Sequence, residues 1–283
     1  MRISTTKAVL KSGMARGLIE FRQAFSGADL IGQLFWPLAT LAAIWFFRDR
    51  EIGVDGLTLG TAMFPGVLGM FVAFGMFLVI QFLAADREDG TLLRAKATPG
   101  GVLSYLLAKL VNVSLTVLVY LLIVAVPGSR LVDGLEVSGP RPWFTLAWVV
   151  LVGLAACQLL GAVLGSLVSS PRAAGYIAMA VLALTAVSGI FYPLTAMPAW
   201  LQWVGQAFPI YWLGLGMRSG LLPDTAAAIE VGGSWRAGES VWVLAAWIVL
   251  GLVLAPFLLR RMARRESGSR VYARRDRALQ RVT

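Results

Sequence analysis

The sequence predicts an all-α integral membrane protein with about six transmembrane helices, and three observations support this. Hydrophobic residues make up 58% of the 283 positions and charged residues only 14%, whereas about a quarter of a soluble domain is charged. Several apolar stretches reach the length of about 20 residues that a spanning helix needs. Lys and Arg gather on alternate connecting segments, as in multi-pass proteins. Lipid is therefore the solvent for most of the chain.

Six stretches meet the requirement for a span, in which every backbone polar group must be satisfied inside its own helix. They are residues 30–47, 57–85, 102–126, 143–168, 173–194 and 241–259. Pro65 and Gly66 predict a kink or a shortening of the second. The chain thus divides into a cytoplasmic N-terminal segment (1–29), a transmembrane domain (30–259) and a basic cytoplasmic tail (260–283).

Residues 14–30, before the first span, combine apolar and charged positions at helical spacing. The apolar set is Leu18, Phe21, Phe25 and Leu30, and the charged set is Arg16, Glu20 and Arg22. This pattern predicts an amphipathic helix in the cytoplasmic interface. A merely solvated leader is the alternative.

The segment 195–240 is apolar at first but is broken by Pro198, Pro209 and Pro223. Its first half predicts a re-entrant hairpin, which is tolerated only where protein or water covers the broken backbone. A surface loop rich in interfacial Trp is the alternative. An interfacial belt is expected from the cluster Trp200, Trp203, Tyr211 and Trp212.

The positive charges predict that both termini are cytoplasmic, because cytoplasmic flanks carry the excess of Lys and Arg. Of the 25 Lys and Arg residues, all but six lie on the same side of the membrane as the termini. The six are Arg48, Arg50, Arg130, Arg141, Arg218 and Arg236. The net charge of +10 then reflects topology and attraction to anionic lipid, not nucleic-acid binding. Arginine far outnumbers lysine, which suggests a GC-rich bacterial genome, so the expected location is a bacterial plasma membrane.

No catalytic, cofactor-binding or metal-binding residues are predicted. The chain has no histidine and a single cysteine, Cys157, which removes the commonest metal ligand and general base. It has no P-loop string. Lys109 is the only charge deep inside a predicted span, and we expect it to extend its amine to the cytoplasmic surface. Energy for any work must come from elsewhere.

Two sets of residues inside the spans have a predicted role. Polar residues that could line a pathway, or only bond to other helices, are Gln81, Asn112, Ser114, Thr116 and Gln158. Small residues at every fourth position of the fourth span predict close packing against another helix. Such a stripe would be enough for two copies of the chain to form a homodimer. The residues of the stripe are Gly153, Cys157, Gly161, Gly165 and Ser169.

The loop after the second span carries helix signals. Asp89 or Thr91 can cap a short helix, and Thr98 followed by Pro99 is a second start signal. The segment therefore predicts a short stiff helix between two spans. A charged hairpin that only connects them is the alternative.

This loop and a second motif downstream resemble permease subunits of the ABC-2 transporter family, which includes daunorubicin-resistance-type drug exporters. The loop motif is Glu88, Gly90-Thr91-Leu92, Arg94 and Ala97-Thr98-Pro99. The second motif is Gly189, Phe191, Pro193, Met197-Pro198, Trp200-Leu201 and Pro209. Gly100-Gly101 departs from the family pattern, in which bulkier residues follow the proline.

The resemblance implies a coupling helix that docks on a cytoplasmic ATPase, and an outer re-entrant hairpin. The coupling set is Glu88, Asp89, Gly90, Thr91, Leu92, Leu93, Arg94 and Ala97; the hairpin set is Gly189, Pro193, Pro198, Trp200 and Pro209. It also implies an ATP-driven exporter of a hydrophobic or amphiphilic drug, antibiotic or lipid. Two copies of a P-loop ATPase would hold ATP and Mg, and the permease would pair with itself or a homologue. A self-sufficient channel or secondary carrier is the alternative.

Overall fold

The computed structural model describes residues 2–51, 58–98, 100–168 and 171–265. These residues form helices, and a lone bridge joins Glu51 and Thr58. The α-helices are α1 (Arg2–Ala24), α2 (Asp29–Phe47), α3 (Leu59–Glu88), α4 (Thr91–Lys96), α5 (Gly101–Leu131), α6 (Pro140–Leu167), α7 (Pro171–Val187), α8 (Ala199–Ala207), α9 (Pro209–Leu221) and α10 (Ala237–Arg265). Two 3-10 helices, η1 (Leu194–Ala196) and η2 (Asp224–Ile229), flank α8 and α9.

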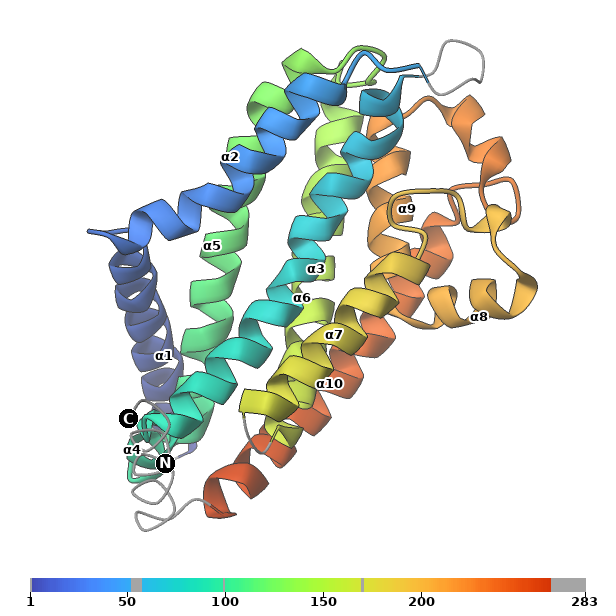
Figure 1. The fold of residues 1–283 in the computed structure, drawn as a ribbon. Coiled ribbons are helices and arrows are strands. Elements are labelled where there is room, and N and C mark those ends of the chain that lie inside the picture. The colour runs from blue at the N-terminus through green and yellow to red at the C-terminus, as the bar shows by residue number, and fades with distance from the viewer. Residues whose placement is uncertain (1, 52–57, 99, 169–170, 266–283) are drawn as a thin grey trace.

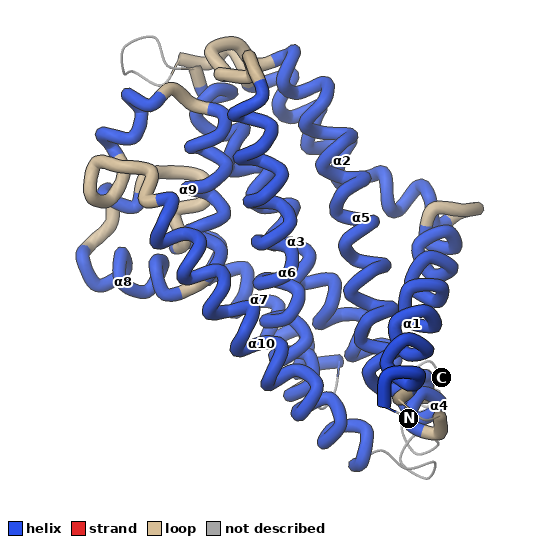
Figure 2. Tube along the Cα trace, turned by 180° about the vertical axis from the view of Figure 1, so that it is seen from behind, coloured by secondary structure: helices blue, strands red, loops and turns tan. Residues whose placement is uncertain are grey.

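Helix α3 is the centre of a long bundle, and α5, α6, α7 and α9 all pack against it. The short helix α4 marks one end of the bundle, where α3 ends and α5 begins (Figure 1). We call this the α4 end. At the opposite end α3 begins and α9 finishes, and Figure 2 shows the same arrangement from behind. The all-α membrane fold predicted from the sequence is confirmed.

Five of these helices, α2, α3, α5, α6 and α10, are long and apolar enough to cross a membrane. Helix α7 has only 17 residues, or about 25 Å at 1.5 Å per residue. It stops at Val187, before the predicted end at residue 194, because Gly189 turns the chain with a φ of 69°. A sixth span therefore stays a prediction.

Proline residues do not end the long helices where the sequence suggested. Helix α3 is continuous through Pro65. It begins at Leu59, where the Thr58 side chain accepts a hydrogen bond from the Thr61 amide. Helix α5 likewise continues through Pro127 to Leu131, beyond the predicted end at residue 126. The predicted basic tail, 260–283, lies mostly outside the described residues.

Apolar side chains cover much of the outside of the bundle. Helix α2 exposes Ile31, Phe35, Trp36 and Phe46, and α10 exposes Trp242, Val253 and Phe257. Large exposed apolar surfaces are unusual on a soluble monomer, and they suit contact with lipid. This surface agrees with the composition.

Helix α1 packs along α5 through glycine. A Cβ at Gly17 would lie 2.6 Å from the Ala108 carbonyl oxygen. The same helix also exposes apolar Leu10, Met14 and Ile19. The helix covers Arg2–Ala24 rather than residues 14–30, because Gly27, with a φ of 61°, separates it from α2. Its location in a membrane interface stays a prediction.

The small-residue stripe of α6 packs inside the chain. A Cβ at Gly161 would lie 2.5 Å from the Met76 carbonyl oxygen, and one at Gly165 would lie 3.2 Å from the Ile80 Cα. Cys157 is fully buried, and a Cβ at Gly153 would overlap Leu213. Ser169 lies outside the described residues. The described glycines of the stripe therefore lie against α3 and α9 inside the chain, and they offer no surface to a second copy.

We expect Gly161→Leu to weaken the packing of α3 on α6, because its side chain would collide with the Met76 backbone. Overpacking a close contact costs about 1–3 kcal/mol, which should lower the unfolding temperature of the purified protein in detergent. Gly175→Leu on α7 is the control, because a Cβ there meets nothing within 4 Å. Equal unfolding temperatures for the two variants would contradict the packing assignment.

Candidate functional site

The segment that joins α3 to α4 is a capped turn. Asp89 ends α3, and its Oδ1 accepts a hydrogen bond from the Thr91 amide at 2.9 Å. Of the two residues predicted to cap α4, Asp89 supplies this bond, although the N-cap position itself is Gly90, which has no side-chain cap. Gly90 lies between them with a φ of 78°, in the left-handed region that favours glycine. The short stiff helix predicted from the sequence is present as α4, Thr91–Lys96.

Helix α4 has one face on the bundle and one face exposed. Leu92 and Ala95 are buried, and Leu93 is half-buried. Residues exposed around them are Glu88, Asp89, Arg94, Lys96 and Ala97. Arg94 donates a hydrogen bond to Thr91 Oγ1 at 2.9 Å. The segment is therefore anchored by apolar contacts and presents charges of both signs on its open side.

Glycines also shape the turn from α4 into α5. Thr98 Oγ1 donates to the Ala95 carbonyl at 3.1 Å, so Thr98 closes α4 rather than capping α5. Gly100 has a φ of 69°. A Cβ at Gly101 would overlap Thr98 and the Ala95 carbonyl. The Gly100-Gly101 pair that departs from the family pattern is therefore required by this turn. Pro99 lies outside the described residues.

A cluster of charged residues around the buried Lys109 lies beside this segment. Lys109 Nζ on α5 is 2.9 Å from Glu20 Oε2 on α1 and 2.8 Å from Asp86 Oδ2 on α3. Tyr105 donates its hydroxyl to Asp86 Oδ2 at 2.7 Å, and Arg16 Nε lies 2.9 Å from Glu20 Oε1. The charges of the two cations, Lys109 and Arg16, balance those of the two carboxylates. The cluster joins α1, α3 and α5 next to the start of α4.

The expectation that Lys109 reaches the cytoplasmic surface is wrong. Its exposure is 6%, because two carboxylates hold the amine inside the bundle. Sequence reasoning missed these partners, since Glu20 and Asp86 are distant from Lys109 in the chain. The available signal was an ionisable residue within a span, which usually has a partner.

At the opposite end, Arg218 of α9 anchors the chain between α7 and η1. Its Nε lies 2.6 Å from Glu230 Oε1, and both side chains are buried. Its Nη1 donates to the carbonyls of Gly189 and Ile190, at 3.2 and 2.9 Å. The arginine therefore satisfies backbone acceptors where α7 has ended. Sequence reasoning counted Arg218 as a loop charge and missed this role.

After α7 the chain runs between α3 and α9 at a point where both helices carry a glycine. A Cβ at Gly66 of α3 would overlap the Ile190 carbonyl, and one at Gly214 of α9 would lie 2.9 Å from the Ile190 Cα. Ile190 itself is fully buried. The turn at Gly189 thus directs Ile190 into a space that exists only because two neighbouring helices carry glycine.

Helix α9 begins level with the middle of the bundle. Leu213 lies against Gly153, near the middle of α6, and Gly220 lies beside Thr145, near the start of α6. At its last residue, Leu221, the carbonyl accepts a hydrogen bond from the Glu136 amide at 2.8 Å. The segment from α7 to α9 therefore turns back at mid-height and returns to the end opposite α4. A re-entrant hairpin in a membrane stays a prediction for this segment.

The predicted hairpin residues lie at its turning points. Gly189 has positive φ, Pro193 precedes η1, Pro198 precedes α8 and Pro209 begins α9. The aromatic cluster divides. Trp200 and Trp203 are 66% and 77% exposed, whereas Tyr211 and Trp212 are buried on α9. The belt interpretation is therefore wrong for the last two, which are core residues.

The polar residues predicted inside the spans do not form one group. Gln158 Nε2 donates to Ser114 Oγ at 3.0 Å, which links α6 to α5. Asn112 and Thr116 are buried on α5. The Asn112 Oδ1 atom has no hydrogen-bond donor within the described part of the chain. Gln81 on α3 is half-buried. Gln158 and Ser114 therefore form a contact between two helices. A role in a transport pathway stays a prediction for the other three residues.

We expect Lys109→Met to destabilise the fold strongly, because it leaves the partly buried Glu20 and Asp86 beside each other without their cation. Loss of one partner from a buried ion pair costs about 3–5 kcal/mol, measurable as a lower unfolding temperature in detergent. Adding Glu20→Gln and Asp86→Asn to the same variant should recover most of the loss. An unchanged unfolding temperature in Lys109→Met would show that the charges are not buried together.

Comparison with known proteins agrees with this architecture. A family profile described as "ABC-2 family transporter protein" matches residues 55–257, which include α3 to α9 and most of α10. No curated protein matches the chain. The matched region includes both the segment around α4 and the segment from α7 to α9. The chain therefore belongs to the ABC-2 family of transporter proteins.

Proposed function

We propose that this chain is the transmembrane subunit of an ATP-driven exporter and that α4 is its coupling helix. The observation that carries the proposal is α4 itself: a short helix fixed to the bundle by Leu92 and Ala95, with charged residues exposed between the ends of two long helices. Membership of the ABC-2 family supports it. A partner that pushed on α4 would act directly on α3 and α5.

The energy source in this proposal is a separate cytoplasmic P-loop ATPase, because the sequence has no P-loop of its own. Two ATPase copies would bind ATP and Mg and close beneath the permease. The α4 end would then face the cytoplasm of a bacterium, with both termini on that side. The excess of Lys and Arg near this end supports that orientation.

The permease would form a dimer, preferably with a second copy of itself, because the family resemblance makes one chain half of a transporter. The stripe on α6 does not supply the contact, since it packs against α3 and α9. Exposed apolar faces such as that of α2 remain accessible. The cargo would be hydrophobic or amphiphilic, and the segment from α7 to α9 would form a re-entrant gate on the outer side.

Co-purification tests the proposal. The tagged chain is extracted gently from its native membrane and the proteins bound to it are identified, with and without replacement of residues 88–97 by a Gly/Ser linker. We expect a soluble P-loop ATPase that disappears on replacement. Recovery of the intact chain with no ATPase would favour a self-sufficient channel or secondary carrier.

A point variant tests the geometry of α4. We expect Gly90→Val to reduce cargo-stimulated ATP hydrolysis by the reconstituted complex. The left-handed backbone at Gly90 costs a residue with a Cβ about 1–2 kcal/mol, enough to disfavour the docked geometry roughly tenfold. Ala85→Val is the control, because Ala85 is exposed within α3 and lies outside the coupling set. Full stimulation in Gly90→Val would mean that α4 does not transmit the signal.

A further inference from the structure

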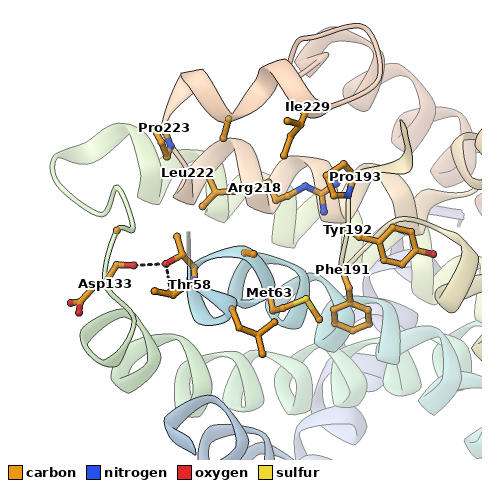
Figure 3. A pocket seen from close by; sticks show the side chains of 15 residues that line it. Thr58, Met63, Asp133, Phe191, Tyr192, Pro193, Arg218, Leu222, Pro223 and Ile229 are labelled. Carbon is orange, nitrogen blue, oxygen red and sulfur yellow. Dashed lines mark hydrogen bonds between the residues drawn. The ribbon is translucent and has the colours of Figure 1, made fainter. Parts of the chain in front are cut away.

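A pocket of about 570 Å³ opens at the end opposite α4. Its walls come from the start of α3, the turn after α5, the stretch between α7 and η1, and α9 with η2 (Figure 3). This volume lies within the range of small-molecule sites, about 300–1,000 Å³. The pocket is therefore large enough for a molecule with an apolar body and one polar group.

The lining is apolar apart from a few groups, and most of those are already hydrogen-bonded. Thr61 Oγ1 donates to the Asp133 carbonyl at 2.7 Å, and Thr58 Oγ1 lies 2.9 Å from Thr61 Oγ1. Figure 3 shows these atoms turned toward each other at one side of the pocket. Apolar side chains, including Met63, Phe191 and Leu222, form much of the remainder.

Arg218 is the exception. It lines the pocket with 4% exposure, and its side chain extends toward Pro193 (Figure 3). Nε and Nη1 have acceptors, but Nη2 has none among the residues that the structure describes. A buried donor without an acceptor is costly. Nη2 is itself buried, so an acceptor brought by a ligand reaches it through a small movement of the pocket wall and then gains a strong, charge-assisted hydrogen bond.

We propose that this pocket binds the polar end of an amphiphile whose acceptor oxygens bond to Arg218 Nη2, with its apolar body against the pocket wall. Carboxylate, phosphate and carbonyl oxygens share this chemistry. Glu230 neutralises the charge of the arginine. The site therefore prefers ligands that carry hydrogen-bond acceptors to ligands that carry a cation, and this preference comes from the unpaired N–H donor and not from a net positive charge. The inference deepens the proposed export function and rests on it, since it would place the cargo's polar end at the outer side.

Binding to the purified permease alone tests the site. The full chain is placed in phosphatidylcholine nanodiscs and titrated with dansyl-labelled undecanoate, with dansyl-labelled undecylamine as the cationic comparison. We expect the acid to bind about tenfold more tightly than the amine. Equal binding of acid and amine would overturn the role of Arg218.

Two matched tryptophan variants locate the binding. Ala226→Trp places a large side chain in the pocket from η2 and leaves Arg218 and Glu230 unchanged in sequence, and it should weaken binding of the acid at least about tenfold. Ala228→Trp lies in the same 3-10 helix but is exposed and outside the lining, and should leave binding unchanged. Equal affinity of both variants for the acid would overturn the pocket assignment.

A third variant tests the charge without leaving a buried ion alone. Arg218→Met combined with Glu230→Met removes both members of the pair, which is tolerated better than removal of one. We expect this protein to bind the acid and the amine equally. Retained preference for the acid would assign the selectivity to another residue and overturn the proposal.

Two further arms identify the source of the ligand and separate this inference from the proposed function. Displacement of the acid by phosphatidylglycerol in the nanodisc would identify a bilayer lipid as the occupant; binding without displacement would identify a smaller amphiphile. Each variant is also tested for ATPase capture. Capture without pocket binding overturns only the pocket, whereas pocket binding without capture overturns only the ATP-driven function.

Discussion

Close approach of helix backbones to α3 is the contact on which the rest of the structure depends. In lipid the hydrophobic effect contributes little to the association of helices, so close van der Waals packing at small residues must hold the helices together. Gly161 brings α6 to the Met76 backbone, and Gly66 admits the chain at Ile190. Because α3 is approached in this way from more than one side, its neighbours cannot shift independently of it.

Two ion clusters, each around a buried cation, complement this packing at opposite ends of the bundle. Lys109 joins α1, α3 and α5 near α4, and Arg218 joins α9 to Glu230 and to the backbone at Ile190. Buried charges contribute little net stability, but removal of one partner is costly. Each cluster therefore fixes which helices stay together. A force on α4 would act on α1, α3 and α5 as one unit.

The sequence was sufficient for features that depend on local pattern. Apolar stretches predicted the long helices, Asp89 predicted the start of α4, and the glycine stripe predicted close packing. Features that depend on distant contacts were missed. Nothing near Lys109 indicates Glu20, and nothing near Arg218 indicates the Ile190 carbonyl. Apolar composition extended the fifth span past Val187, where the turn at Gly189 ends the helix, and it cannot distinguish exposed Trp203 from buried Trp212.

Helix α3 connects the two candidate regions mechanically. It runs without a break for 30 residues, about 45 Å at 1.5 Å per residue. One end adjoins α4, and the other contributes Leu59 and Met63 to the pocket. Pro65 lies just beyond the pocket wall, where it removes one backbone hydrogen bond. Because α3 is one continuous helix, a displacement of its α4 end would also displace the helix at Gly66. At Gly66 the helix contacts the Ile190 backbone, whose carbonyl accepts a hydrogen bond from Arg218.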